Sequence, residues 1–304
     1  MTTATPTLAL KTALSDAGPL KALLDGSVQP EGARLEREQI NILAAFRSMC
    51  RTLNFDVCEM AVVTYFTARH YGIAMTAIPV FPLSNLVGRP GIFTANVNSG
   101  IETGKDLEGK RVGVRSYTLT PGTWARSVLR DHLGVNLDKV TWVLNDEEHV
   151  EQYHKETPKN VERLVGADLG KMLSEGAIDA GIMLMRGELA NVQPAFDEAR
   201  KAAQDAFRRA GVAPVDHTVV IRTALLQEHP WLARAVFEAM KRAKAEWRAR
   251  TPDAPPADDL LNDPMPLGFT NTRKTLETLM RLAVEQRILP RPLDVDELFP
   301  GKLD

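Results

Sequence analysis

The sequence predicts an α/β protein with largely parallel sheets. Short apolar runs rich in β-branched residues alternate with amphipathic segments, which is the pattern of strands connected by helices. Glycines such as Gly72 and Gly176 mark the ends of helical segments. With 304 residues, of which 44% are hydrophobic and 25% charged, the chain can bury a large core. Its length permits one large domain or two lobes.

The first half of the chain contains helices and strands in close alternation. Ile42, Phe46 and Met49 recur near helical spacing, which indicates an amphipathic helix. A later apolar run is stopped by Pro82, as expected of a strand that ends there. In order, we expect a helix over 38–51, a helix over 59–72, a strand over 76–81, and a strand, a short helix and another strand within 91–115.

The second half repeats this alternation. A helix, a stop at Gly176 and a strand follow one another within 169–184, as in a βαβ unit. The Pro- and Asp-rich residues 251–259 indicate a loop. The other predicted elements are a helix from Thr120, a strand over 139–144, a helix over 195–211, a strand over 216–222, and helices over 229–250 and 272–287.

Charge and cysteine content exclude several classes of protein. The net charge of −2 gives no bias toward nucleic acid or an anionic membrane, so any selectivity for anions must be local. Cys50 and Cys58 lack partners at zinc-site spacing, so we expect two buried thiols, with no disulfide and no metal. The first residues do not resemble a secretory signal, and no apolar run is long enough to span a membrane, so we expect a cytoplasmic protein.

The stretch VGVRSYTLTPGTWARSVL, residues 112–129, suggests an anion site. A strand ends at Arg115, hydroxyl side chains follow at Ser116, Tyr117, Thr118 and Thr120, and a helix begins behind Pro121. We expect Thr120 to cap this helix, whose free N–H groups and positive dipole end suit a carboxylate or phosphate. The alternative is a well-capped helix beside a surface arginine.

Several stretches, taken in order, resemble the 4,5-dihydroxyphthalate decarboxylase family. They are LKALLDG, FDVCEMAVVTYF, AIPVFP, NVNSGIETGKDLEGKRVGVRSYTLT, HTVVIR, HPWLARAVFEA and TRKTLETLMRLAVEQRILPRPLDVDELF, and together they span nearly the whole chain. The resemblance implies the type-II periplasmic-binding-protein fold, with two α/β lobes and a ligand cleft between them. Residues 1–95 and 215–304 would form the first lobe and 96–214 the second, with the strands at 91–98 and 216–222 as the hinge.

Two positions depart from the pattern of that family. The family commonly has Gly-Asp-Tyr at the end of the first strand, where this chain has SDAG, so Asp16 is kept and the tyrosine is lost. After IPVFP the family usually carries an arginine and a histidine, whereas this chain reads LSNLVGRPG. Arg89 would supply the cation there, and the histidine is missing.

Glu59 is the first candidate for acid–base chemistry. Decarboxylation of a dihydroxyaromatic acid needs a proton delivered to the ring carbon and no obligatory cofactor. We expect Glu59 where a strand gives way to a helix, partly desolvated by Phe55, Tyr65 and Phe81, which would raise its pKa and make it a proton donor. Tyr65 and Phe81 would also contact the ligand. The alternative is a first-turn glutamate that complements the helix dipole.

Histidines and arginines supply the other candidates. His217 begins the returning hinge strand, where it would exchange a proton with the substrate or, alternatively, fix the hinge by hydrogen bonds. Arg186 follows the strand IDAGIMLM, residues 178–185, and, with Arg115, would hold carboxylates at strand ends; the alternative is a surface salt bridge. His149 and His154 are five residues apart in an acidic segment that we expect to be solvated, so they do not suggest a metal pair.

The sequence therefore supports two functions. The first is cofactor-independent decarboxylation of a hydroxylated aromatic dicarboxylate such as 4,5-dihydroxyphthalate. The second is non-catalytic binding of a small organic anion, as a solute-binding protein or a sensor, which the missing histidine within 82–91 favours. Neither requires nucleic acid or a membrane. The sequence does not specify the exact acid, and it is compatible with a homo-oligomer.

Overall fold

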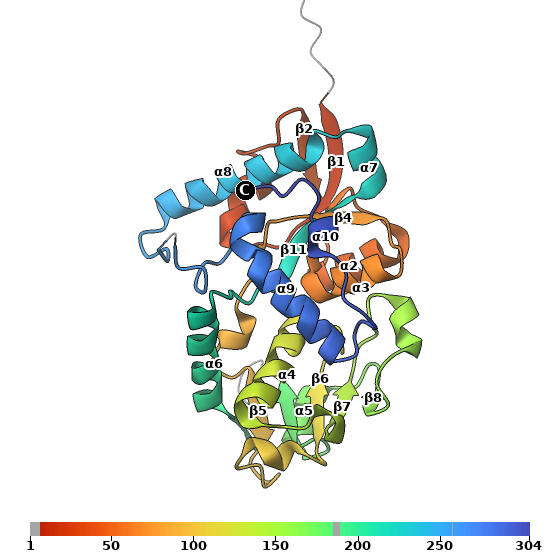
Figure 1. Cartoon of the computed structure of the whole chain (residues 1–304), viewed down its shortest axis with the longest axis vertical. Coiled ribbons are helices and arrows are strands. Elements are labelled where there is room, and N and C mark those ends of the chain that lie inside the picture. Colours follow the sequence, from red (N-terminus) through yellow and green to blue (C-terminus); the bar gives the residue numbers. More distant parts are fainter. Residues whose placement is uncertain (1–6, 185–188, 257) are drawn as a thin grey trace, which may run out of the picture. The chain divides into compact units, whose positions relative to one another are not determined.

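The computed structural model describes residues 7–184, 189–256 and 258–304, which form two compact units (Figure 1). Unit 1 comprises residues 1–84, 215–277 and 293–304, and unit 2 comprises residues 85–214 and 278–292. The expected division differs at two places, because it assigned residues 85–95 and 278–292 to the first lobe. The strand at Phe93–Asn96 pairs with two strands of unit 2, and Gln286 hydrogen-bonds Thr123 and Arg126 there.

Unit 1 contains a five-stranded sheet in the order β2-β1-β3-β11-β4. Its strands are β1 (Leu8–Ala13), β2 (Ala33–Arg37), β3 (Val57–Ala61), β4 (Met75–Ile78) and β11 (His217–Arg222). The first three run parallel, whereas β11 lies antiparallel between β3 and β4. The sheet thus joins a strand from near residue 220 to strands from the first 80 residues.

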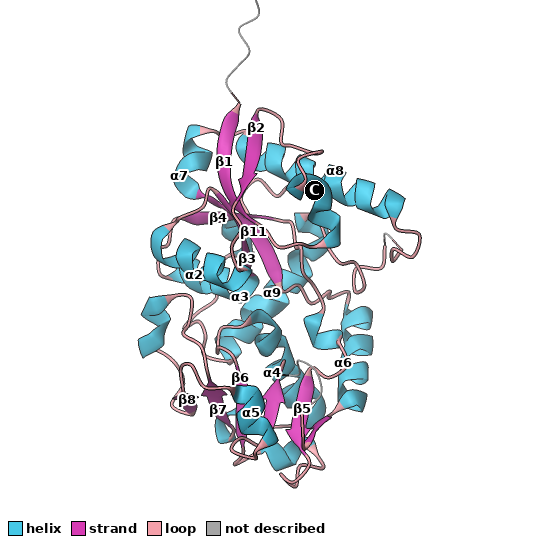
Figure 2. Cartoon of the chain, turned by 180° about the vertical axis from the view of Figure 1, so that it is seen from behind, coloured by secondary structure: helices cyan, strands magenta, loops and turns pink. Residues whose placement is uncertain are grey.

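Helices cover both faces of this sheet (Figure 2). Val57, Val219 and Ile221 share a buried cluster with Val236 and Met240 of α8 (Leu232–Arg250). On the opposite face, helix α2 (Ile42–Thr52) approaches β3, where Cys50 Sγ lies 4.0 Å from Met60 Sδ. Both cysteines are free and buried as expected, and burial raises the pKa of the Cys50 thiol to about 12.

Unit 2 contains a six-stranded sheet in the order β10-β5-β9-β6-β7-β8. Strands β6, β7, β8 and β9 pair in parallel, whereas β5 pairs antiparallel with β9 and β10. The bounds are β5 (Phe93–Asn96), β6 (Arg111–Val114), β7 (Thr141–Leu144), β8 (Val161–Arg163), β9 (Ala180–Ile182) and β10 (Val192–Pro194). Helices α4 (Thr120–Leu133) and α6 (Asp197–Ala210) pack together through Trp124 and Phe207.

The remaining helices complete the two units. They are α1 (Lys21–Leu24), α3 (Val62–His70), α5 (Leu169–Ser174), α7 (Thr223–Glu228), α9 (Phe269–Glu285) and α10 (Val295–Leu298), with short 3₁₀ turns at Gly18–Leu20, Leu86–Gly88, Gly104–Leu107, Leu137–Lys139 and Glu151–Lys155. Helix α9 contributes its first residues to unit 1 and its last to unit 2. Within the described residues, no helix has the length and apolarity needed to cross a membrane.

The predicted alternation of helices and strands is confirmed, with local corrections. The helix expected over 59–72 begins only at Val62, because Val57–Ala61 is a buried strand, so Glu59 lies inside the sheet rather than at a helix start. The first strand, expected only through its end at SDAG, spans 8–13, and three short strands at 33–37, 161–163 and 192–194 had not been assigned. These three are edge strands, and such short segments show little hydrophobic periodicity in the sequence.

Candidate functional site

The central contact of unit 1 joins Glu59 to His217. Nδ1 of His217 lies 2.6 Å from Oε1 of Glu59, and the backbone N–H of Ser15 donates to Oε2 at 2.8 Å. Antiparallel pairing of β3 with β11 sets Ala61 opposite His217, so Glu59 and His217 are diagonal neighbours on one face of the sheet. Two candidates proposed separately from the sequence therefore form one pair.

Glu59 is ionised in this setting, which corrects the expectation of a raised pKa. Burial alone raises the pKa of Glu59, but the hydrogen bond and charge of His217, with hydrogen bonds from Ser15, outweigh that effect. The net result is a pKa below the ordinary value of a glutamate. An ionised carboxylate only accepts hydrogen bonds, so Nδ1 of His217 must carry the proton that they share.

The other ring nitrogen of His217 is available for chemistry. Within the described residues Nε2 has no hydrogen-bond partner, and the side chain is 10% exposed. The ring of Phe46 meets the imidazole edge-on, with centroids 5.0 Å apart. Glu59 and Phe46 therefore hold the ring in one orientation.

The other unit 1 candidates have different environments. Asp16 lies just beyond β1 and is exposed, with its carboxylate 2.9 Å from Nη2 of Arg37. Tyr65 is fully buried; its hydroxyl donates to the carbonyl of Leu298 and accepts from the N–H of Ala77. Phe81 is also fully buried, among other aromatic rings. Tyr65 and Phe81 thus belong to the core, and Asp16 lies at the surface.

In unit 2, a protein carboxylate occupies donors of the predicted anion site. Glu148 is fully buried and accepts hydrogen bonds from the N–H of Tyr117 at 2.6 Å and the N–H of Thr118 at 3.2 Å. The hydroxyl of Thr118 donates to the same carboxylate at 2.5 Å. The expectation that the segment around Glu148 is solvated is wrong, because the turn after β6 needs an acceptor for these buried donors.

The start of α4 also differs from the expectation. Leu119, not Thr120, is the residue before the helix, and no side chain caps it. Thr120 is the first helical residue and is fully buried, and Pro121 occupies the second position. The helix ends at Leu133, with Gly134 in the left-handed conformation.

A buried arginine reinforces this turn from the other side. Arg126 is fully buried and donates from Nη2 to the carbonyl of Tyr117 and from Nε to Gln286, both at 2.7 Å. Its guanidinium stacks 4.2 Å from the centroid of the Tyr117 ring. Burial lowers the pKa of Arg126, and nearby Tyr117, Tyr153 and Glu148 oppose that change. The peptide of Tyr117 thus joins the buried carboxylate to the buried cation.

The remaining candidates of unit 2 are scattered over its surface and interior. Arg115 is partly exposed, with Nη1 3.4 Å from Oδ2 of Asp146. Ser116 is buried in the turn, whereas Arg89 is exposed at the end of a 3₁₀ turn. Arg186 lies outside the described residues. Of these residues, Arg115 adjoins the turn held by Glu148.

No metal site emerges from the histidines. His149 is buried beside Glu148, and His154 lies within the 3₁₀ turn at Glu151–Lys155. Among the residues that the structure describes, no three His, Cys, Asp or Glu side chains gather as metal ligands would.

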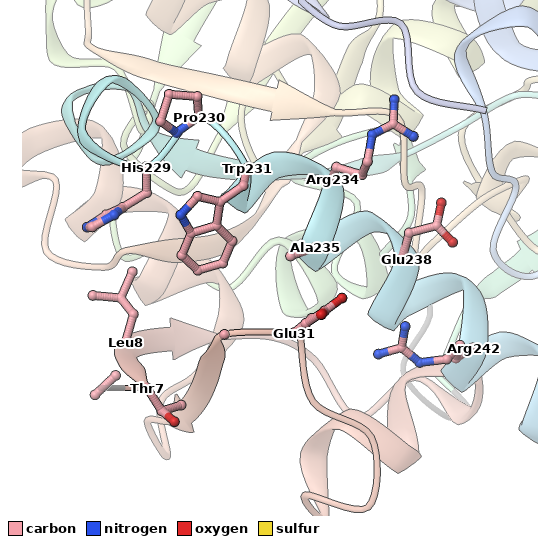
Figure 3. Close-up of a pocket in the computed structure, with 12 residues that line it drawn as sticks. Thr7, Leu8, Glu31, His229, Pro230, Trp231, Arg234, Ala235, Glu238 and Arg242 are labelled. Carbon is pink, nitrogen blue, oxygen red and sulfur yellow. The ribbon is translucent and has the colours of Figure 1, made fainter. Parts of the chain in front are cut away.

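Two of the hollows in unit 1 lie at opposite ends of β1. A cavity of about 960 Å³ lies at the start of β1, with the indole of Trp231 at its centre (Figure 3). It contains none of the predicted site residues, and it adjoins the strand end opposite to Ser15 and Glu59. A smaller hollow of about 300 Å³ lies beyond the end of β1 and is lined by Asp16, Lys21 and Arg37 among others. The smaller hollow therefore lies at the same end of β1 as Ser15, which donates to Glu59.

Comparison with curated proteins gives two relatives of the same name. The chain is 30% identical over 264 residues to 4,5-dihydroxyphthalate decarboxylase of Comamonas testosteroni, a match that covers 81% of this chain and 78% of the relative. It is 31% identical over 179 residues to 4,5-dihydroxyphthalate decarboxylase of Pseudomonas putida, covering 54% of this chain and 65% of that protein. No family model matches the sequence.

Solved structures with a similar fold share little sequence with this chain. The periplasmic aliphatic sulphonate binding protein SsuA from Escherichia coli has a TM-score of 0.57 at 13% identity, covering 99% of this chain and 94% of that one. The desulfurization enzyme DSZB has a TM-score of 0.51 at 15% identity, covering 96% of each chain. These likenesses confirm the predicted two-lobed, periplasmic-binding-protein-like fold.

Proposed function

Because the chain belongs to the 4,5-dihydroxyphthalate decarboxylase family, we propose that it releases carbon dioxide from a hydroxylated aromatic dicarboxylate such as 4,5-dihydroxyphthalate. The observation that carries the residue assignment is the 2.6 Å contact between the buried carboxylate of Glu59 and Nδ1 of His217. A carboxylate–imidazole pair with a free Nε2 is suited to proton transfer. His217 is the catalytic residue, and Glu59 positions it.

The reaction exchanges a proton for a carboxyl group. Nε2 of protonated His217 donates its proton to the ring carbon that bears the leaving carboxylate, and ring hydroxyls supply electron density to that carbon. The bond from the ring to the carboxylate then breaks, its electron pair returns to the ring, and carbon dioxide departs. One proton is consumed for each carbon dioxide, so His217 must be protonated again from solvent.

Glu59 contributes charge and orientation. Its carboxylate holds the N–H at Nδ1, which leaves Nε2 as the nitrogen that donates the proton, and its negative charge stabilises the imidazolium. In a buried setting this attraction is stronger than in water. The fold separates the two roles, because Glu59 is inside the sheet and His217 is at a strand end.

A direct assay tests this function. Purified protein is incubated with 4,5-dihydroxyphthalate and with other hydroxylated phthalates and benzoates, while carbon dioxide and the aromatic product are quantified. We expect stoichiometric release from a dihydroxyphthalate. If a ligand raises the melting temperature but no carbon dioxide appears from any acid tested, decarboxylation is the wrong function.

Binding without chemistry is the second candidate. The fold likeness to sulfonate-binding proteins and the lack of a histidine within 82–91 favour it. Both candidates take a small organic anion, so the measurement of carbon dioxide distinguishes them.

A further inference from the structure

Two adjacent residues at the end of β1 connect the Glu59–His217 pair to a cation. Ser15 donates its N–H to Glu59 at 2.8 Å, and the neighbouring Asp16 places its carboxylate 2.9 Å from Nη2 of Arg37. Arg37 is the last residue of β2, which runs parallel to β1 and pairs through Thr12. The cation and the proton-transfer pair therefore lie at the same carboxyl-terminal edge of one sheet, where ligands of open α/β sheets bind.

The guanidinium of Arg37 is only partly satisfied. The carboxylate of Asp16 forms an ion pair with Nη2, at 2.9 Å, whereas Nε is buried without an acceptor within the described residues. The Arg37 side chain is 23% exposed and that of Asp16 is 79% exposed, so the ion pair is weak and opens easily in water. Arg37 thus retains donors for an incoming carboxylate, which a planar guanidinium binds through two hydrogen bonds.

The space next to Arg37 fits such a group. The hollow of about 300 Å³ beyond β1 is lined by two cations, Arg37 and Lys21, and by two carboxylates, Asp16 and Asp25. This volume is at the lower end of the range for small-molecule sites. Arg89, which the sequence suggested as the cation, belongs to unit 2, whereas Arg37 shares a sheet with Glu59 and His217.

We propose that Arg37 binds the carboxylate that the substrate retains and so makes the site specific for aromatic dicarboxylates. This inference rests on the proposed function. His217 acts on the carboxylate that leaves, and Arg37 holds the one that stays. The product keeps the retained carboxylate, so its affinity depends on Arg37 as well. A catechol without any carboxylate lacks that contact.

The test compares ligands with and without a carboxylate. Affinities for 4,5-dihydroxyphthalate, for 3,4-dihydroxybenzoate and for catechol are measured by titration calorimetry on the wild type and on Arg37→Met. We expect the two carboxylates to bind about ten- to a hundredfold more weakly to the variant, as for loss of one charge-assisted contact, and catechol to bind equally well to both proteins. Arg37→Lys should recover part of the loss.

A matched control is available on the same strand. Arg34 is an exposed residue of β2 that pairs with Glu36, so Arg34→Met removes a charge of the same kind while all three affinities stay unchanged. An equal loss for catechol, or no loss for either carboxylate, overturns the proposal. Calorimetry measures binding alone, so it tests the role of Arg37 even if the wild type releases no carbon dioxide. A lack of carbon dioxide release would refute only the proposed reaction.

Discussion

Nδ1 of His217 lies 2.6 Å from Oε1 of Glu59, although the two residues are 158 positions apart in the chain. The contact exists because β11 inserts antiparallel between β3 and β4, which sets His217 opposite Ala61. The fully buried carboxylate requires such a partner, since an isolated charge in the interior is costly. The sheet topology therefore builds the pair that we assign to proton transfer.

Replacing the imidazole should abolish most turnover. His217→Gln keeps a side chain that can hydrogen-bond Glu59 but cannot deliver a proton at neutral pH, so we expect kcat to fall by about 10²- to 10⁴-fold with a smaller change in KM. Glu59→Gln should lower kcat as well, through loss of orientation and charge. Release of carbon dioxide under saturating 4,5-dihydroxyphthalate measures both effects.

An exposed histidine provides the control for that experiment. His132 lies in the last turn of α4, so His132→Gln should retain wild-type turnover. Wild-type kcat in His217→Gln would remove this residue from the mechanism.

The ionised state of Glu59 predicts how stability depends on pH. The pKa of Glu59 is lower in the folded protein than its ordinary value of 4.5, so the unfolded chain binds the proton more tightly. The stabilisation from Glu59 is complete above that ordinary value and is lost as the pH falls through the lower, folded pKa. Lowering the pH should therefore reduce the free energy of unfolding of the wild type by more than that of Glu59→Gln.

Urea unfolding at a series of pH values between about 3 and 7 measures this component. The difference in free energy of unfolding between wild type and Glu59→Gln should shrink as the pH decreases. Glu31→Gln removes an exposed carboxylate and corrects for the change in net charge. A difference that stays constant over this range would contradict a lowered pKa at Glu59.

Glu148 should contribute strongly to the stability of unit 2. Glu148→Ala leaves the N–H groups of Tyr117 and Thr118 buried without their acceptor and removes a negative charge near the buried Arg126. Each unsatisfied donor costs about 1–3 kcal/mol, so we expect a loss of about 3 kcal/mol or more in the free energy of unfolding.

The matched control for this prediction is three residues away. Glu151 is exposed, and Glu151→Ala should change the free energy of unfolding by less than about 0.5 kcal/mol. Chemical denaturation of the two variants gives the comparison. Equal stabilities would show that water replaces the carboxylate of Glu148 at no cost.

Candidate residues could be predicted from their neighbours in the sequence, but contacts that depend on how distant strands pair could not. Glu59 and His217 were each recognisable as candidates from their neighbours in the chain, but their contact depends on strand pairing across 158 residues. Arg37 gave no signal, because an arginine at the end of a short edge strand looks like any solvated residue. Only its 2.9 Å ion pair with Asp16, just beyond the end of β1, places it near the Glu59–His217 pair.

The turn after β6 illustrates the same limit within unit 2. Its row of donors was evident from the hydroxyl and backbone groups of residues 115–120, and the physics of such turns led us to expect an anion as their partner. The sequence did not indicate that Glu148 would meet Tyr117 and Thr118, since that contact requires the end of β7 to lie beside the end of β6.

We predict that Arg115, the cation next to this turn, binds the carboxylate of a ligand. Tyr117 and Thr118 donate to Glu148, whereas the side chain of Arg115 is partly exposed beside Asp146. A ligand carboxylate would compete with Asp146 for the guanidinium. Losing that contact should weaken binding of 4,5-dihydroxyphthalate to Arg115→Met by about ten- to a hundredfold, and Arg115→Lys should recover part of it. Arg111 is the first residue of β6, the strand that Arg115 follows, and its ion pair is with Glu162 of β8, so Arg111→Met is the control and should bind as the wild type does. Titration calorimetry decides the matter, because wild-type affinity in Arg115→Met would leave this turn a structural element that Glu148 and Arg126 hold together.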